Sequence, residues 1–164
     1  MISAGDYRET MARFASGVTI ITTTDPDGRW WGFTASSFSS LSIDPPLILV
    51  CLARDARCHP AFTSAARFRV NVLALEHEAL AGRFGTKNAD KFAGNEFRLG
   101  ADGLPILDDA LVSLRCRTVE LAAGGDHTIL IACVEAAQLR RDGKPAVNVD
   151  RRYWDLVPRE AAER

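Results

Sequence analysis

The sequence predicts a mainly β protein, a small antiparallel β-barrel decorated with short helices. About seven segments rich in β-branched and aromatic residues follow one another at the spacing of hairpins. Two of the connections, at residues 25–28 and 141–144, carry the Asp and Gly residues of tight turns. The chain has no GxGxxG segment, so a doubly wound dinucleotide-binding sheet is not expected.

Length and composition indicate one globular domain over residues 1–164, with a frayed tail from about residue 158. A chain of 164 residues is long enough to bury a core. The formal net charge of -1 gives no electrostatic signature for nucleic acid or for an anionic membrane. No segment reaches the roughly 18 apolar residues of a membrane span, and the N-terminus is polar rather than signal-like. We therefore expect a cytoplasmic protein.

The cysteines and histidines argue against a disulfide framework and against a metal site. The four cysteines are widely spaced without a CxxC pair: Cys51, Cys58, Cys116 and Cys133. We interpret them as reduced packing residues. The three histidines share no ligand spacing with each other or with a cysteine: His59, His77 and His127.

The N-terminal third predicts a helix and then a hairpin. Residues 6–16 form a helical pattern that ends at Gly17, with four side chains on one face: Tyr7, Met11, Phe14 and Ala15. Residues 18–24 are largely β-branched, and a second strand entered at Arg29 should pair with them. Pro45-Pro46 cannot continue a central strand, so we expect a bend there and a new strand over residues 47–52.

The middle of the chain alternates short helices with strands. Pro60 suits the first turn of a helix ending near Ala66. Residues 68–73 alternate as a strand, in which we expect Asn71 to satisfy a buried backbone group. Residues 76–84 predict a second helix that Gly85 ends.

The last third predicts a long loop followed by strands. Residues 86–109 should form a surface loop with one helical turn at residues 90–92. The apolar alternation of residues 111–121 changes phase, which predicts a bulge near Arg117-Thr118. A strand over residues 127–139, the hairpin turn at 141–144 and strands at 145–149 and 153–157 should then complete the sheet.

The chemistry concentrates between Trp30 and Leu52, where small hydroxyl residues lie between two strong strand segments. Hydroxyls and backbone amides there can line an uncharged groove for a phosphate or a heterocycle. An ordinary Ser-rich loop is the alternative interpretation.

Three stretches in this order resemble the flavin reductase family that partners two-component flavin monooxygenases. They are TASSF at residues 34–38 running into SLSIDPPLILVCL, NVLALEHEALAGRFGTKNADKF at 71–92, and GGDHTILIACV at 124–134. The resemblance implies a split β-barrel of the FMN-binding type, an antiparallel Greek-key barrel, and a homodimer. It also implies NAD(P)H-dependent reduction of free FMN or FAD by hydride transfer to flavin N5. The reduced flavin would supply a separate monooxygenase.

The resemblance also assigns site residues. Two adjoining segments would hold the isoalloxazine and ribityl chain: Thr34, Ala35, Ser36, Ser37 and Phe38, continued by Ser39 and Ser40. A further set would contact the flavin phosphate and any adenine half: Cys51, Leu52, Ala53, Arg57, Cys58, Arg83, Phe84, Lys91 and Phe92. The nicotinamide would meet Gly125, Asp126 and His127, with His127 as the catalytic residue. The segment Arg152, Tyr153 and Trp154 would close over the pyridine nucleotide.

Several of these assignments have a plain structural alternative. A lone histidine at the start of a buried strand is often a capped structural residue, and Arg83 and Lys91 are equally compatible with solvated helix charges. The resemblance favours NADH, with NADPH possible, and leaves FMN against FAD open. Two rival functions remain: a non-catalytic flavin carrier or sensor, and a flavoprotein oxidase with tightly bound FMN on the same barrel.

Overall fold

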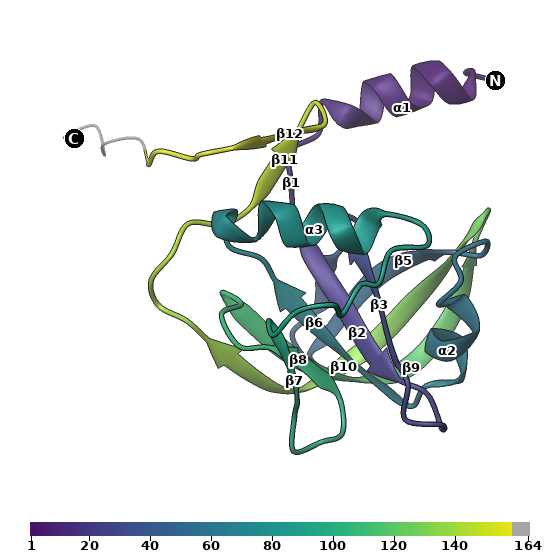
Figure 1. Ribbon diagram of the computed structural model, residues 1–164. Helices are drawn as coiled ribbons and strands as arrows, with labels where there is room; N and C mark the ends of the chain where they lie inside the picture. The colour runs from purple at the N-terminus through teal and green to yellow at the C-terminus, as the bar shows by residue number, and fades with distance from the viewer. Residues whose placement is uncertain (159–164) are drawn as a thin grey trace.

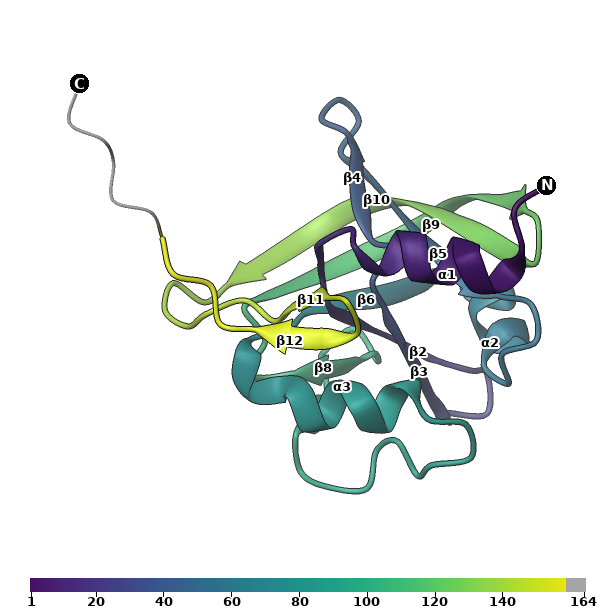
Figure 2. The ribbon, with the colours of Figure 1, turned by 90° about the horizontal axis from the view of Figure 1, so that it is seen from above.

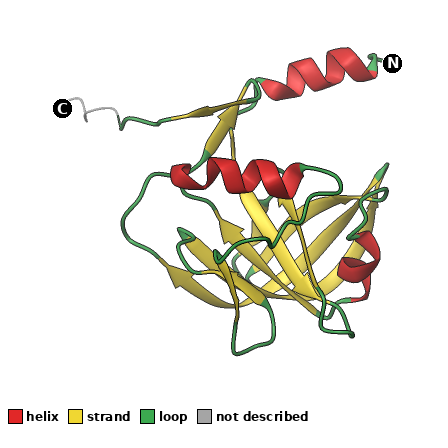
Figure 3. Cartoon of the chain, viewed as in Figure 1, coloured by secondary structure: helices red, strands yellow, loops and turns green. Residues whose placement is uncertain are grey.

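A computed structural model describes residues 1–158, and the tail predicted to fray lies outside the described residues apart from its first residue. The body is an antiparallel seven-stranded sheet with short helices around it (Figures 1 and 3). Its strands, in spatial order, are β3 (Trp30–Ala35), β2 (Thr19–Thr24), β6 (Arg67–Val72), β9 (Val112–Gly124), β10 (His127–Leu139), β5 (Leu47–Ala53) and β4 (Ser39–Ser42). The prediction of a mainly β fold with antiparallel pairing and short helices is confirmed.

The sheet is strongly curled. β3 and β4 are its two edge strands, yet only residues 36–38 separate them along the chain. The step from Ala35 to Ser39 spans at most about 14 Å when fully extended. The two edges must therefore approach one another, although no ladder joins them within the described residues. The result is an open, barrel-like body with a gap along the free edge of β3.

Two apolar clusters pack against this sheet. Inside the curl, Phe62 of α2 (His59–Ser64) packs with Phe33 and Phe68, and all three are buried. Outside the curl, Phe84 and Leu80 of α3 (Glu78–Gly85) are buried members of the second cluster. A 3-10 turn, η1 (Leu75–His77), leads directly into α3.

A buried polar network attaches a small hairpin, β7 (Phe97–Leu99) with β8 (Pro105–Leu107), to the sheet. Asn71 donates to Ile20 O at 3.1 Å and accepts from Leu107 N and Ser113 Oγ at 3.3 and 3.2 Å. The expectation that Asn71 satisfies buried backbone groups is confirmed. Beside it, the guanidinium of Arg69 donates to Asp102 at 2.6 Å and to Ser113 at 3.2 Å.

The N-terminal helix and the last strands differ from expectation. α1 (Ala4–Ala12) ends before Phe14 and buries none of its residues, with Tyr7 and Met11 about half exposed. The predicted apolar face therefore has no partner within the described chain. β1 (Ser16–Gly17) pairs with β11 (Val147–Val149), which pairs in turn with β12 (Arg152–Trp154). The three strands form a separate sheet that projects with α1 from the body (Figure 1). The prediction that these strands complete the main sheet is wrong, because β11 pairs with β1 instead of β10.

Most other elements follow the sequence closely. The β2–β3 hairpin, the restart after Pro46 and the bounds of β10 are confirmed. Figure 2 shows the long β9–β10 hairpin crossing the body, and its register shifts at Val119, close to the predicted bulge. The loop predicted over 86–109 contains a hydrogen-bonded turn from Asp90 to Ala93 and, unexpectedly, the β7–β8 hairpin. No helix within the described residues has the length and apolar character to cross a membrane.

Candidate functional site

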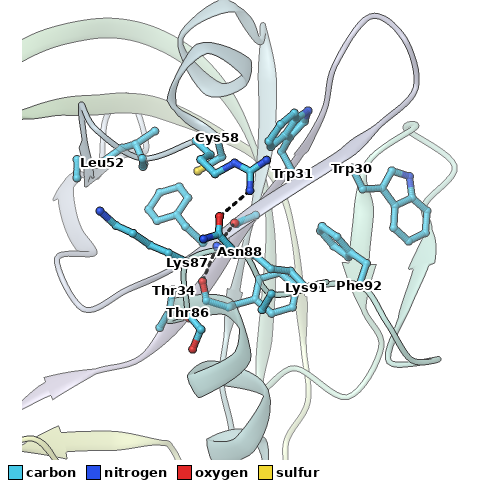
Figure 4. Close-up of a pocket in the computed structure, with 18 of the residues that line it drawn as sticks. Trp30, Trp31, Thr34, Leu52, Cys58, Thr86, Lys87, Asn88, Lys91 and Phe92 are labelled. Atoms are coloured by element: carbon cyan, nitrogen blue, oxygen red, sulfur yellow. Dashed lines mark hydrogen bonds between the residues drawn. The ribbon is translucent and has the colours of Figure 1, made fainter.

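A cavity of about 800 Å³ opens along the gap beside β3. Its walls come from β3, the end of β5 with the loop behind it, and the segment that follows α3 (Figure 4). Ten of the residues assigned by resemblance line it: Thr34, Cys51, Leu52, Ala53, Arg57, Cys58, Phe84, Lys91, Phe92 and His127.

The β3 wall is built on close packing at one glycine. A Cβ at Gly32 would lie 2.7 Å from the ring of Phe84, so only a glycine lets α3 approach this strand. Because β3 is an edge strand, alternate residues turn backbone groups away from β2. This edge therefore offers hydrogen-bonding groups to the cavity without adding charge.

The hydroxyl run between the two sheet edges has a mixed role. Thr34 lines the cavity, but its hydroxyl donates to Ala81 O of α3 at 2.6 Å. Ser37 lies outside the lining and bonds the backbone of Cys51, accepting from its N–H at 3.0 Å and donating to its C=O at 3.3 Å. These bonds fix residues 36–38 across the gap. The remaining members of the run also lie off the lining: Ala35 and Phe38, which pack on the core, and the exposed Ser36, Ser39 and Ser40.

Cationic side chains cross the mouth of the cavity. Arg57 donates to Asn88 Oδ1 at 2.8 Å, and Lys87 Nζ lies 3.0 Å from the carboxylate of Asp55. Lys91 is half-buried and donates to Gly32 O at 3.1 Å and to Phe84 O at 2.7 Å. Burial lowers the pKa of the Lys91 ammonium.

Arg83 does not join these cations. Its guanidinium donates to the carbonyl of Ala93 and pairs with Glu96, and it lies outside the cavity lining. Cys58 does line the cavity, but burial raises the pKa of its thiol, so the group stays neutral and packs as a small apolar side chain. Among the described residues, no three His, Cys, Asp or Glu side chains gather as a metal site.

His127 occupies the wall where β10 begins. Its Nδ1 lies 2.7 Å from Asp126 Oδ1, an arrangement that directs Nε2 away from this carboxylate. The hydrogen bond with His127 lowers the pKa of Asp126. Gly125 adopts a φ of +68°, which supplies the left-handed turn before the strand. Gly125 and Asp126 lie next to the cavity in sequence but do not line it.

The structure does not bring the predicted closing segment to the cavity. Arg152, Tyr153 and Trp154 form β12 of the projecting sheet, and none of them lines the cavity. Several lining residues were not predicted: Arg29, Trp30, Trp31, Gly32, Phe33, Asp55, Ala56, Gly85, Thr86, Lys87, Asn88, Ala89 and Asp90. These residues could have been found because they are neighbours in the sequence of predicted site residues. β3 begins four residues before Thr34, and residues 86–90 connect two segments that were predicted to belong to the site.

The sequence matches known proteins over most of its length. The profile described as "Flavin reductase like domain" matches residues 11–156. The chain is 48% identical over 152 residues to a Streptomyces coelicolor protein named actinorhodin polyketide dimerase, covering 93% of this chain and 86% of that protein. It is 40% identical over 159 residues to FMN reductase (NADH) RutF of Variovorax paradoxus, covering 96% and 88%.

Solved structures with the same fold support this relationship. The Streptomyces globisporus NADH:FAD oxidoreductase SgcE6, in complex with NAD and FAD fragments, superimposes with a TM-score of 0.89 at 31% identity, covering 96% of this chain and 97% of that one. BorF, the flavin reductase component of a bacterial two-component tryptophan halogenase, gives a TM-score of 0.87 at 28% identity, covering 96% and 100%. The chain belongs to the flavin reductase family.

Proposed function

We propose that this protein uses NADH to reduce free FMN or FAD, and that the reduced flavin leaves to supply a separate monooxygenase. NADPH is the alternative donor. The observation that carries the proposal is the cavity beside β3. Its lining combines an uncharged wall with cationic side chains at the mouth and with His127. Membership of the family supports it, because relatives are named NADH-dependent flavin reductases and one is a component of a two-component system.

The lining fits a flavin. Hydride transfer from a nicotinamide to flavin N5 needs two stacked rings at close approach and no protein nucleophile. The free edge of β3 offers uncharged hydrogen-bonding groups for a ring that is polar on one side. Arg57 and Lys87 are available for a phosphate, because their present partners, Asn88 and Asp55, lie on the exposed rim. We assign the neutral Cys58 only a packing role.

His127 is the residue to which we assign nicotinamide alignment. The Asp126 carboxylate accepts from Nδ1, so the ring is oriented and Nε2 remains for a carboxamide or ribose group. We propose that Gly125 contributes only the turn that this pair requires. The roles of Ser36, Ser37, Ser39 and Ser40 are proposed to be along the outer edge of the flavin, next to Cys51.

We also propose a homodimer built from one split-barrel domain. The linker at 36–38, which joins two unpaired sheet edges, is the feature that favours the split-barrel description. A nine-residue helix with no buried residue is marginal alone, and Tyr7, Met11 and the following Phe14 expose apolar surface. A second copy would cover that surface, and could bring Arg152, Tyr153 and Trp154 to the neighbouring cavity. The four unpaired cysteines favour a cytoplasmic location.

Steady-state NADH oxidation with and without added FMN or FAD tests the proposed activity. We expect turnover that requires free flavin and that saturates with its concentration. No flavin-dependent oxidation of NADH or NADPH would overturn the proposal. Sedimentation of the same preparation measures the oligomeric state independently.

One relative favours a second candidate. The protein named actinorhodin polyketide dimerase is 48% identical to this chain, and its name denotes a reaction on a polyketide. By analogy, this protein would hold flavin tightly in the cavity and act on a polyketide substrate of its own. A protein that keeps its flavin through desalting supports that candidate, whereas colourless protein with full activity on added flavin supports the first.

A further inference from the structure

The two sides of the cavity mouth are joined by a reciprocal pair of contacts. The loop that follows β5 carries Asp55 and Arg57, and the segment that follows α3 carries Lys87 and Asn88. Arg57 donates to Asn88 Oδ1 at 2.8 Å, and Lys87 Nζ donates to Asp55 Oδ2 at 3.0 Å. In Figure 4, Asn88 lies near the centre of the view and Lys87 extends toward Leu52. Each side of the mouth therefore supplies one cation and one acceptor to the other.

The position of Asp55 is fixed by the backbone around it. Ala56 N donates to Ala53 O at 3.1 Å, which closes a turn that contains Asp55. Arg54 N donates to Asp126 O at 3.0 Å and so ties this turn to the residue that precedes β10. The carboxylate is therefore held at the mouth, whereas the long, flexible lysine side chain opposite can turn to a new partner.

The carboxylate of Asp55 is the feature of the mouth that disfavours an anionic ligand. Two carboxylates line the cavity, Asp55 and Asp90, and among the described residues only Asp55 forms an ion pair. Both side chains of the Asp55–Lys87 pair are exposed, and such a pair adds little to stability. A phosphate at the mouth would meet a neutralised lysine and the repulsion of a like charge. Asn88, the partner of Arg57, carries no charge and so opposes a phosphate much less.

We infer that Asp55 limits the affinity for the flavin phosphate, so that reduced flavin leaves the cavity readily. The inference rests on the proposed flavin reduction and adds a residue that governs product release. A reductase that passes its product to another enzyme needs fast dissociation, and product release often limits turnover. Lys87 attracts the phosphate, and Asp55 competes for the same ammonium group and so shortens the residence time of the flavin.

Asp55→Asn tests the inference, because it removes the charge and keeps the shape of the side chain. FMN and riboflavin are the probes, since they share the ring and only FMN has a phosphate. We expect the dissociation constant for FMN, measured by calorimetry, to fall roughly three- to tenfold. The constant for riboflavin should stay the same, and the gain for FMN should shrink in high salt. The rate of FMN dissociation, measured by stopped-flow fluorescence, should fall by a similar factor.

Asp155→Asn is the matched control. It removes the same charge from another exposed lysine–aspartate pair, with Lys144 at 2.8 Å, and Asp155 lies outside the cavity lining. Binding of both probes should stay unchanged in this variant. Lys87→Met is the second test variant, and it leaves the turn around Asp55 intact. It should weaken the binding of FMN a few-fold and leave that of riboflavin unchanged, because it removes the cation for which phosphate and carboxylate compete.

The outcomes separate the inference from the proposed activity. Unchanged or weaker FMN binding in Asp55→Asn, or an equal gain for riboflavin, would overturn the inference. An unchanged FMN affinity in Lys87→Met would overturn it as well. Tighter FMN binding in Asp55→Asn, with no flavin-dependent NADH oxidation by the unmodified protein, would instead overturn the proposed reductase activity. The effect of Asp55 on phosphate affinity would then still stand.

Discussion

Two clusters of buried or half-buried polar groups in this molecule are built on different principles. Around Asn71, nearly every donor and acceptor has a protein partner, and Arg69 is neutralised by Asp102 at 2.6 Å. Around the cavity, Lys91 uses two backbone carbonyls, and His127 is engaged at Nδ1 only. The first cluster holds the β7–β8 hairpin in place, whereas the second keeps donors available. The difference separates a structural network from a site that awaits a ligand.

Removing the charge partner in the structural network should have the largest effect. Asp102→Ala leaves the Arg69 guanidinium buried and unpaired, so we expect a loss of about 3–5 kcal/mol in the free energy of unfolding. Denaturant unfolding measures this loss. The matched control is Asp108→Ala, which breaks the exposed pair with Arg98 and should cost at most about 1 kcal/mol. Equal losses in the two variants would contradict the comparison.

A substitution in the cavity wall should affect stability and binding together. Gly32→Ala places a Cβ 2.7 Å from the Phe84 ring, and the repacking should cost about 1–3 kcal/mol. Flavin affinity should also fall, because α3 and β3 both line the cavity.

Gly82→Ala is the control for that substitution. Gly82 lies in α3, where a Cβ meets nothing within 4 Å, so alanine should stabilise the helix by about 0.5–1 kcal/mol. Thermal unfolding and flavin titration of both variants check the pair. An unchanged flavin affinity in Gly32→Ala would show that the wall tolerates displacement.

His127→Ala should change catalysis and leave stability unchanged. We expect kcat/KM for NADH to fall roughly tenfold, with little change in flavin affinity, because the ring aligns the nicotinamide. His59→Gln is the control, since His59 bonds Thr128 Oγ1 at 2.9 Å and does not line the cavity. Loss of flavin binding in His127→Ala would contradict this assignment. It would show that His127 belongs to the flavin site or supports the fold.

The smallest effect should come from Asp126→Asn. The bond with His127 lowers the pKa of Asp126 in the folded protein, so the carboxylate is charged throughout the neutral range. A depressed pKa adds stability above the unfolded value, and that stability is lost as the pH falls through the folded pKa. We expect a few-fold rise in KM for NADH at neutral pH, because an amide at position 126 would hold the His127 ring less firmly. Steady-state kinetics measure this change, and an unchanged KM for NADH would contradict the positioning role of Asp126.

The sequence predicted the elements that are set by local patterns. The β-branched run of β2, the turn at Gly28 and the alternation of β10 determine their own bounds. Asn71 was also predictable, because an amide inside an apolar strand needs partners. The bulge could be anticipated from the phase change in β9, within two residues of Val119.

Long-range placement could not be predicted in the same way. Nothing local in residues 147–154 distinguishes pairing with β1 from pairing with β10. Arg83 lies next to cavity residues in the chain, but the helix turns its side chain toward Glu96. Trp31 was missed for the opposite reason, because its place in the cavity lining depends on the curl that opens a cavity beside β3.

The free edge of β3 has a consequence for colloidal behaviour. An unpaired strand edge can template pairing with another chain and so promote aggregation. Here the segment 86–92 covers that edge, and Lys91 bonds the carbonyl of Gly32. The segment that shapes the cavity therefore also acts as a guard against intermolecular strand addition. Loosening it would reduce solubility along with ligand affinity, and a bound flavin would protect the protein during storage.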